Sequence, residues 1–384
     1  MKRLYVLLVF IVTGSLLHAQ PLSKLNFSAN YYPDNSIRAT QLLLEDKLFI
    51  QLTNPDNHDL ALKLVEFGGW NKKPENEIPL EGFCDQGRCD VEIGPDKIRE
   101  GFTYVLWVYD NQLEADLFFE IHSLTNNIPD IILKDHNGLL LLDDYLTLNS
   151  EVMVQSLSSV LGVYVNYYSH AFTPADPPTG VRNLPSRALI PDTVYFISNN
   201  VPFKPLGAGL YFFQNDTSQI EGMAIRVEKE AYPGYNELVE LKECMVYITS
   251  GKEWKKLNNP ALDKKIFDGV WLEMAGNTSD AGEAIRTYFR RVKKANEFFT
   301  NYKEGWKTDM GIIYIIFGPP QEVNVERKRE VWHYTEALTH DEVEFIFEKR
   351  PNRLSPDNKV LLRDNHYSHA WNYTIDRIRR GKEK

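Results

Sequence analysis

The hydrophobic pattern of this sequence changes once, near Ser250-Gly251. Before this point, apolar and polar residues alternate in short runs, as in half-buried β-strands. After it, residues Leu262 to Met274 place an apolar side chain at every fourth position, as in an amphipathic helix. A chain of 384 residues is long enough for two or three domains. We therefore expect a mainly β, multidomain protein that ends in a small α+β domain, a helix pair plus an antiparallel sheet.

The first predicted domain, residues 21–126, contains short strands between turn sequences such as Asn54-Pro55 and Gly68-Gly69. About seven strands at this spacing, rich in Tyr, Phe and Val, predict an immunoglobulin-like β-sandwich. Its alternating aromatic residues are expected to fill the core between the two layers. The clearest predicted strands are Phe27–Tyr31, Leu48–Leu52, Leu62–Phe67, Gly101–Tyr109 and Ala115–Ile121.

A second immunoglobulin-like β-sandwich, less regular than the first, is predicted for residues 127–251. A polar, proline-rich stretch from Phe172 to Pro191 has no periodicity and is expected to be a loop. The predicted strands are Ile131–Leu133, Leu139–Leu142, Val160–Tyr168, Thr193–Ile197, Gly209–Phe213, Glu221–Val227 and Cys244–Ile248.

The first residues predict export. Lys2 and Arg3 precede an apolar run from Leu4 to Val12, and the small residue Ala19 follows, which is typical of a signal peptide over residues 1–20. The apolar run is too short for an ordinary transmembrane helix, although an uncleaved anchor is an open alternative. We expect no transmembrane segment after removal of the signal, and a periplasmic or outer-membrane-associated protein.

Cysteine usage agrees with an oxidising compartment. Cys84 and Cys89 flank a glycine-containing turn, so a disulfide at a hairpin tip is expected. No further ligands at matching spacing lie near them, so no metal site is expected there. Cys244 stands alone and has the neighbours of a buried strand residue.

The charge is unevenly distributed. Residues 20–251 carry 16 basic and 32 acidic side chains, whereas residues 252–384 carry 25 basic and 21 acidic ones. An acidic protein is a poor candidate for binding nucleic acid, because phosphate neutralisation needs Lys and Arg. The uneven charge instead indicates separate units.

The small α+β domain is predicted for residues 252–350, and it should begin with two helices. The first, Ala261–Ala275, should end at Gly276-Asn277. The second should begin near Thr278, with Asp280 and Glu283 at the spacing of a capping box. A Gly-Trp-x-Thr-Asp corner then follows, and Ile312–Phe317 is expected to be a strand that pairs with strands Glu330–Thr335 and Val343–Glu348. The tail from residue 351 to 384 should be a short basic helix or a loose extension.

These residues resemble the GWxTD domain family, which is found in exported proteins of Bacteroidota and related bacteria. The resemblance covers roughly residues 255–350, with departures at Met310 and Gln321. It implies an envelope protein of uncharacterised activity and supplies no accepted catalytic residues. The motif positions singled out are Arg291, Asn296, Gly305, Trp306, Thr308, Asp309, Gly318, Pro319 and Pro320.

Asp309 admits two interpretations. It can hold a hydrogen-bonded turn, with Arg290 or Arg291 neutralising its charge, or it can be a catalytic carboxylate partnered by Glu330 or Glu322. The structural interpretation is favoured, because a hydrogen-bonded turn accounts for the residues of a Gly-Trp-x-Thr-Asp corner without a catalytic role. No cofactor is expected.

A cluster of Asp364, His366 and His369 contains residue types that ligate metals. No predicted helix or strand fixes their geometry, so no metal site is assigned to it.

Three functions are compatible with this sequence. The leading hypothesis is a non-enzymatic interaction or structural component of the cell envelope, whose partner is another envelope protein. The alternative is an envelope hydrolase acting on glycan or peptide through Asp309 and Glu330, whose carboxylates should then face one cleft about 5 to 9 Å apart. The third is a carbohydrate-binding module that uses exposed aromatic side chains. The discriminating observation is whether Asp309 faces a cleft or bonds within the fold.

Overall fold

The computed structural model describes residues 20–44, 46–85, 87–121, 130–169, 172–180, 189–335 and 342–382. The predicted signal peptide, apart from residue 20, and the predicted boundary at Asn126-Asn127 lie outside these residues. The described chain is mainly β, with several antiparallel sheets and a C-terminal region of helices plus a sheet. It divides into two compact units: Met1–Pro129 with Glu322–Trp332, and Asp130–Gln321 with His333–Lys384.

The first unit contains two four-stranded sheets, ordered β1-β2-β6-β5 and β4-β3-β7-β8, that contribute side chains to one core. Alternation buries Leu48, Ile50 and Leu52 of β2 in that core, as the period of a strand requires. The strands are β1 (Arg38–Leu44), β2 (Lys47–Thr53), β3 (Leu60–Phe67), β4 (Pro74–Leu80), β5 (Phe83–Asp85), β6 (Arg88–Ile93), β7 (Thr103–Asp110) and β8 (Ala115–Ile121).

Most sequence predictions for this unit are confirmed, including four of the five strands. The disulfide is confirmed as well: Cys84 and Cys89 are joined and lie opposite each other in the β5–β6 pair. The strand predicted at Phe27–Tyr31 is wrong, because Ser28–Tyr31 forms a 3-10 turn. The Asn26 side chain accepts a hydrogen bond from Ser28 N at 2.9 Å. Such local side-chain bonds compete with strand pairing.

A late segment of the chain also belongs to the first unit. It contains β18 (Glu322–Glu326) and the beginning of β19 (Arg329–Tyr334), which confirms the strand predicted at Glu330–Thr335. Phe27 N donates to Val323 O at 2.9 Å, and Val323 N donates to Asn26 Oδ1 at 3.0 Å. These bonds attach the late segment to the start of the described chain.

The second unit begins with two sheets, β10-β9-β12-β15 and β11-β17-β16-β13-β14, which share a core. Their pairs are antiparallel except β11 with β17, which is parallel. The strands are β9 (Ile131–Asp135), β10 (Leu140–Leu141), β11 (Tyr145–Thr147), β12 (Val152–Ser156), β13 (Gly162–Tyr168), β14 (Thr193–Ser198), β15 (Pro202–Phe203), β16 (Gly209–Gln214) and β17 (Met223–Glu228).

Six of the seven strands predicted here are confirmed, and residues 172–180 contain neither helix nor strand. The strand at Cys244–Ile248 is wrong. Cys244 ends helix α2 (Leu238–Cys244), and Met245–Tyr247 forms a 3-10 turn. Periodicity cannot separate a short apolar run in a strand from one in a buried helix. Cys244 is nevertheless buried, and that burial raises the pKa of its thiol well above the ordinary value.

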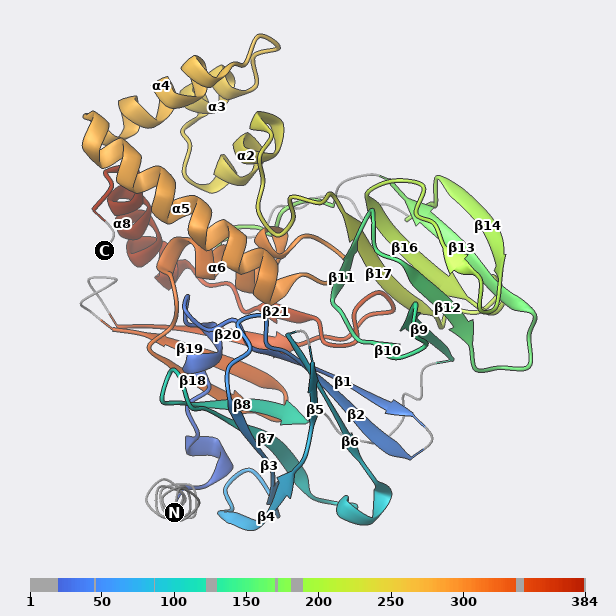
Figure 1. Cartoon of the computed structure of the whole chain (residues 1–384). Coiled ribbons are helices and arrows are strands. Elements are labelled where there is room, and N and C mark those ends of the chain that lie inside the picture. The colour runs from blue at the N-terminus through green and yellow to red at the C-terminus, as the bar shows by residue number, and fades with distance from the viewer. Residues whose placement is uncertain are drawn as a thin grey trace, which may run out of the picture. The chain divides into compact units, whose positions relative to one another are not determined.

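Helices dominate the remainder of the second unit (Figure 1). They are α3 (Gly251–Leu257), α4 (Lys264–Ala275), α5 (Thr278–Phe299), α6 (Asp309–Phe317) and α8 (Ser368–Arg379), and β20 (Val343–Lys349) pairs with β21 (Lys359–Leu361). Helices α4 and α5 confirm the predicted pair, and Gly276 ends α4 at φ 84°. The predicted capping box is wrong, because the Asn277 side chain caps α5 and Glu283 pairs with Arg286.

Ile312–Phe317 is not a strand, and its predicted sheet pairing is therefore wrong. The segment belongs to α6, in which every residue from Met310 to Phe317 is buried. A helix that is apolar all round is stable only when other elements enclose it. Here Tyr314 packs on Phe299 of α5, and Phe317 packs on Phe345 of β20 and on Trp371 of α8.

The C-terminal tail is ordered over its described residues rather than loose. Helix α8 buries Ala370, Trp371, Thr374 and Ile378, and Arg379 forms a salt bridge with Glu253 of α3. Within the described ranges, none of the helices combines the length and apolarity needed to cross a membrane.

Candidate functional site

Two glycines bring the Gly-Trp-x-Thr-Asp corner into direct contact with α5 and α6. A Cβ atom on Gly305 would lie 2.0 Å from Ala295 O of α5, and one on Gly311 would lie 1.9 Å from Gly305 O. Both positions therefore require glycine for close approach. A glycine that follows a helix end often has positive φ, but Gly305 begins the 3-10 turn Gly305–Lys307 and has no positive φ.

Hydrogen bonds from two side chains satisfy the buried backbone of the corner. Asn296, which is fully buried, accepts from Trp306 N at 3.0 Å and donates to Pro233 O at 2.8 Å. Thr308 Oγ1 donates to Gly305 O at 2.8 Å and accepts from Gly311 N at 3.0 Å, which caps α6. The Trp306 side chain is buried. Asn296 and Thr308 therefore stabilise the backbone conformation of the corner.

Asp309 is bonded within the fold. Its Oδ2 accepts from Leu361 N at 3.1 Å, and its Oδ1 forms a salt bridge with Arg363. Arg363 Nη2 also donates to Asp176 O at 3.0 Å. The Asp309 side chain retains 11% of its exposure. The carboxylate therefore meets both a backbone N–H and a cation, beside the N-terminus of α6, where negative charge is favoured.

Arg291 lies at the other end of α6, so the expectation that it neutralises Asp309 is wrong. Its Nη1 donates to Ile316 O at 2.9 Å, among the carbonyls that a helix C-terminus leaves unpaired. Gly318 follows at φ 77°, and a Cβ there would lie 2.8 Å from Arg291 Nη2. Pro319 and Pro320 come next, and proline cannot continue the helix. The Gly-Pro-Pro turn is thus a helix end that Arg291 covers.

A buried charge network that we did not predict lies beside the corner. Glu304 Oε1 lies 2.8 Å from Lys307 Nζ and 3.3 Å from Arg226 Nη2, and Arg226 also binds Glu228. Burial favours the neutral form of Glu304, yet the Arg226 and Lys307 charges hold its pKa below the ordinary value. Burial raises the pKa of Glu228, which has Arg226 as its strongest opposing charge. Arg226 and Glu228 lie two positions apart on β17 and therefore on the same face of the strand. Nothing in the sequence near them predicts their contact with Glu304.

The two carboxylates of the hydrolase alternative belong to different units, and neither unit contains both. Glu330 is buried, and its Oε1 accepts from Tyr31 at 2.8 Å and from Trp332 Nε1 at 2.6 Å. Burial and the nearby Glu330 raise the pKa of Tyr31 well above its ordinary value. Each carboxylate is thus held by partners of its own unit. Glu322, the other partner considered, is exposed at the start of β18.

The histidine cluster lies at the start of α8. His366 Nδ1 and Asp364 Oδ1 are 2.9 Å apart, and both side chains are more than half exposed. His369 stacks on Tyr373. No group of three or more His, Cys, Asp or Glu suited to a metal ion occurs among the described residues.

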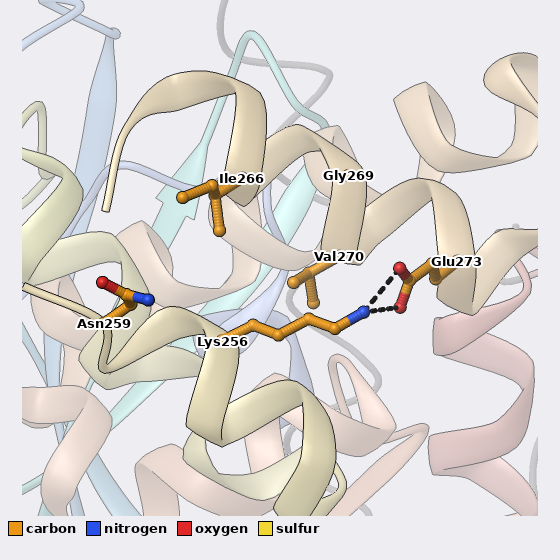
Figure 2. A pocket seen from close by; sticks show the side chains of 6 residues that line it. All are labelled: Lys256, Asn259, Ile266, Gly269, Val270 and Glu273. Carbon is orange, nitrogen blue, oxygen red and sulfur yellow. Dashed lines mark hydrogen bonds and ion pairs between the residues drawn. The ribbon is translucent and has the colours of Figure 1, made fainter. Parts of the chain in front are cut away.

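Two surface pockets lie away from the corner residues. One, of about 280 Å³, lies between α3 and α4 (Figure 2). The other, of about 440 Å³, is lined by the end of α4, the start of α5 and the end of α8. None of the motif residues named above lines either pocket.

Comparison with known proteins identifies the region around this corner. A family model described as GWxTD domain matches residues 209–380. The match begins earlier and ends later than the resemblance found by inspection, and it includes Arg226, Arg363 and α8. No curated protein matches this chain. The chain therefore carries a GWxTD domain over residues 209–380, which confirms the predicted resemblance to the GWxTD domain family.

Proposed function

We propose that this chain is an exported, non-enzymatic protein-interaction component of the cell envelope. The observation that carries the proposal is the apolar edge of the five-stranded sheet in the second unit. Strand β14 is the last strand in that sheet, and its Val194 and Phe196 side chains are each 49% exposed. Tyr164 of the neighbouring strand packs edge-on against Phe196 and is 38% exposed.

The sequence of β14 itself lacks the features that usually protect an edge strand from pairing. Natural edge strands carry charged residues, prolines or bulges that prevent another strand from adding to the sheet. No charged residue or proline occurs from Thr193 to Ser198, and the pairing of β14 with β13 shows no register shift. An extended segment of a partner could add to this edge through backbone hydrogen bonds and cover the apolar side chains.

The corner supports the same proposal, because its polar residues serve internal packing. Asp309 bonds to Leu361 N and Arg363, and Asn296 and Thr308 bond to backbone groups. The signal-like first twenty residues and the Cys84–Cys89 disulfide support export to an oxidising compartment. We extend the proposal to the two β regions as immunoglobulin-like sandwiches that serve as spacers and binding platforms.

Site-specific photocrosslinking in intact cells tests this proposal. A photoreactive residue at position 194 or 196 should give a discrete crosslinked protein, and one at the exposed position 92 should not. In the presence of Phe196→Lys, the crosslink from position 194 should be lost. The absence of any protein crosslink from both positions would overturn the proposal. Mass spectrometry of the mature N-terminus in the envelope fraction would test export.

A further inference from the structure

Three loops meet at one end of the two sheets with which the second unit begins. They join β12 to β13 (residues 157–161), β14 to β15 (residues 199–201) and β16 to β17 (residues 215–222). The strand pairing brings them together, because Gly162 lies opposite Ser198 and Tyr164 lies opposite Gln214. We call these three loops the tip loops.

The tip loops expose aliphatic side chains. Leu161 is 88% exposed and Ile220 is 67% exposed. Leu157 and Val160 are exposed as well. At the other end of β13, by contrast, Tyr168 is buried in a cluster against which Tyr302 of the same unit packs. The described residues of this unit thus cover the far end of the strand and leave the apolar tip in contact with solvent.

The tip loops have few charged residues, and most of these are acidic. No charged residue occurs from Val152 to Ser169, or from Thr193 to Phe203. The charged residues that flank the tip loops are three acids and one base, Asp130, Asp216, Glu221 and Lys204. Acidic side chains are repelled by anionic headgroups, so a lipid surface that accepts these loops should be zwitterionic.

Side chains within the tip loops satisfy backbone groups that would otherwise need water. Asn199 accepts from Ser156 N at 2.9 Å and donates to Val160 O at 2.8 Å. Gln214 Nε2 donates to Gln219 O at 2.7 Å. A backbone that enters a bilayer must have internal partners for its polar groups, because water is scarce there. These internal bonds therefore suit loops that leave water.

The residue types at the tip favour a bilayer over a protein partner. Binding energy in protein interfaces is concentrated in Trp, Tyr and Arg, whereas Leu and Val are under-represented. The exposed apolar residues at the tip are Leu, Val and Ile. The half-exposed aromatic Tyr164 lies three positions behind Leu161 on β13, roughly 10 Å along a strand. Aliphatic residues at greater depth than aromatic ones are typical of segments anchored at a membrane surface.

We propose that the tip loops insert into the surface of a zwitterionic lipid bilayer. The side chains that enter the outer hydrocarbon are Leu157, Val160, Leu161 and Ile220, at a depth of roughly 5–10 Å. This inference goes beyond the proposed function and does not depend on it, because none of these four side chains belongs to β14. A partner strand on β14 would then bind beside the membrane surface.

The test places an environment-sensitive fluorophore on the full chain. Leu161→Cys can be labelled selectively with a maleimide, because Cys244 is buried and Cys84 is joined to Cys89. With phosphatidylcholine vesicles, emission from position 161 should rise several-fold and shift to the blue, and nitroxides attached to the lipid should quench it. Asn149→Cys is the matched control, because residue 149 is exposed at the opposite end of β12, and its label should not respond.

Charge at the tip should weaken the insertion. In the chain labelled at position 161, Ile220→Asp should lower the vesicle partition coefficient at least about tenfold. Leu139→Asp is the matched control, because Leu139 is an exposed leucine that follows the opposite end of β9, and it should change the coefficient less than about twofold. Because the label reports its own surroundings, vesicle binding by the apolar run from Leu4 to Val12 would not produce these differences.

Several outcomes would overturn the inference. One is a label at position 161 that does not respond, or that responds no more than the label at position 149. Insertion that requires anionic lipid would overturn the zwitterionic class. A photoreactive residue at position 161 that crosslinks to a protein in intact cells, and not to lipid, would show a protein occupant instead. If the vesicle assay fails while position 196 still crosslinks to a partner, this inference alone is wrong. The reverse result would overturn the proposed function alone.

Discussion

Gly311 and Gly269 are both glycines within helices of the same domain, and the structure gives them opposite roles. A Cβ on Gly311 would lie 1.9 Å from a backbone carbonyl oxygen, whereas a Cβ on Gly269 would meet nothing within 4 Å. The first glycine closes a corner in which the backbone of one segment rests on that of another. The second leaves a helix surface open. The same residue type therefore marks a packed joint in one place and an unfilled surface in the other.

The surroundings of the two glycines differ in the same way. At the corner, Asn296 and Thr308 satisfy buried backbone groups, and Asp309 has both a backbone donor and Arg363. Near Gly269, the polar groups are a solvent-accessible ion pair, Lys256 with Glu273, each about half exposed. The polar groups of the Gly-Trp-x-Thr-Asp corner thus have more partners within the fold than those near Gly269.

The largest expected effect is at the corner. Gly305→Ala should lower the free energy of unfolding by about 3 kcal/mol or more, because its Cβ would collide with the backbone of α5 rather than with a flexible side chain. Urea unfolding followed by circular dichroism at a helical wavelength measures this. Gly282→Ala serves as the control and should not destabilise the chain. An unchanged midpoint for Gly305→Ala would show that the corner is not closely packed.

The Asp309–Arg363 pair should give the next largest effect. Arg363→Met leaves a mostly buried carboxylate with a hydrogen bond from Leu361 N and the nearby Lys303 charge, and should cost about 2–3 kcal/mol. Asp309→Asn should cost less, since it removes the charge that needs a partner. In the double variant the two losses should not add. If the two losses added strictly, Asp309 and Arg363 would not interact. The catalytic interpretation of Asp309 would then have to be considered again.

Acid should weaken the salt bridge between α3 and α8 before it affects the corner bonds of Asn296 and Thr308, which do not titrate. Hydrogen bonds from Arg379 lower the pKa of Glu253 on α3 to about 2. Because the folded-state pKa lies below the ordinary value of 4.5, this stabilisation is present above pH 4.5 and is lost as the pH falls toward 2. Urea midpoints of the wild-type chain should therefore fall through this window. Arg379→Gln should flatten the fall, and an identical slope in both proteins would contradict the assignment.

The smallest expected effect has the opposite sign. Gly269→Ala should raise the free energy of unfolding by about 0.5–1 kcal/mol, because alanine is a better helix former and its Cβ has free space. Gly311→Ala in the same assay should destabilise strongly. A destabilising Gly269→Ala would mean that the fold itself needs this glycine, which would contradict the open space around it.

The local sequence pattern was sufficient to predict structure where the interacting residues lie close in sequence. The Cys84–Cys89 hairpin, the alternation of β2 and the apolar stripes of α4 and α5 are short-range features, and each prediction was confirmed. The apolar run Ile312–Phe317 is different, because it satisfies strand and buried-helix patterns equally. The sequence did contain a local signal for the helix: Thr308 is a capping residue, and Asp309 adds a negative charge in the first turn.

The partner of Asp309 illustrates what the sequence could not supply. We expected a neighbouring arginine of α5, but Arg363 lies 54 positions away, and only packing of the chain brings it to the N-terminus of α6. Similarly, Glu304 meets Arg226 of β17 across a long separation in sequence. No periodicity encodes such pairs, because the choice depends on which elements are adjacent in space.

By itself, the sequence determined the mainly β character of the chain, the hairpin disulfide, the helix pair and the GWxTD domain. These depend on residues that interact within a few positions, or on a motif with fixed spacing. Only the tertiary structure decided that α6 is a helix, that Asp309 is bonded within the fold, and that Gly305 and Gly269 have different roles. The physical reason is that each of these depends on which atoms approach from distant segments, and close packing rather than local propensity then decides the outcome.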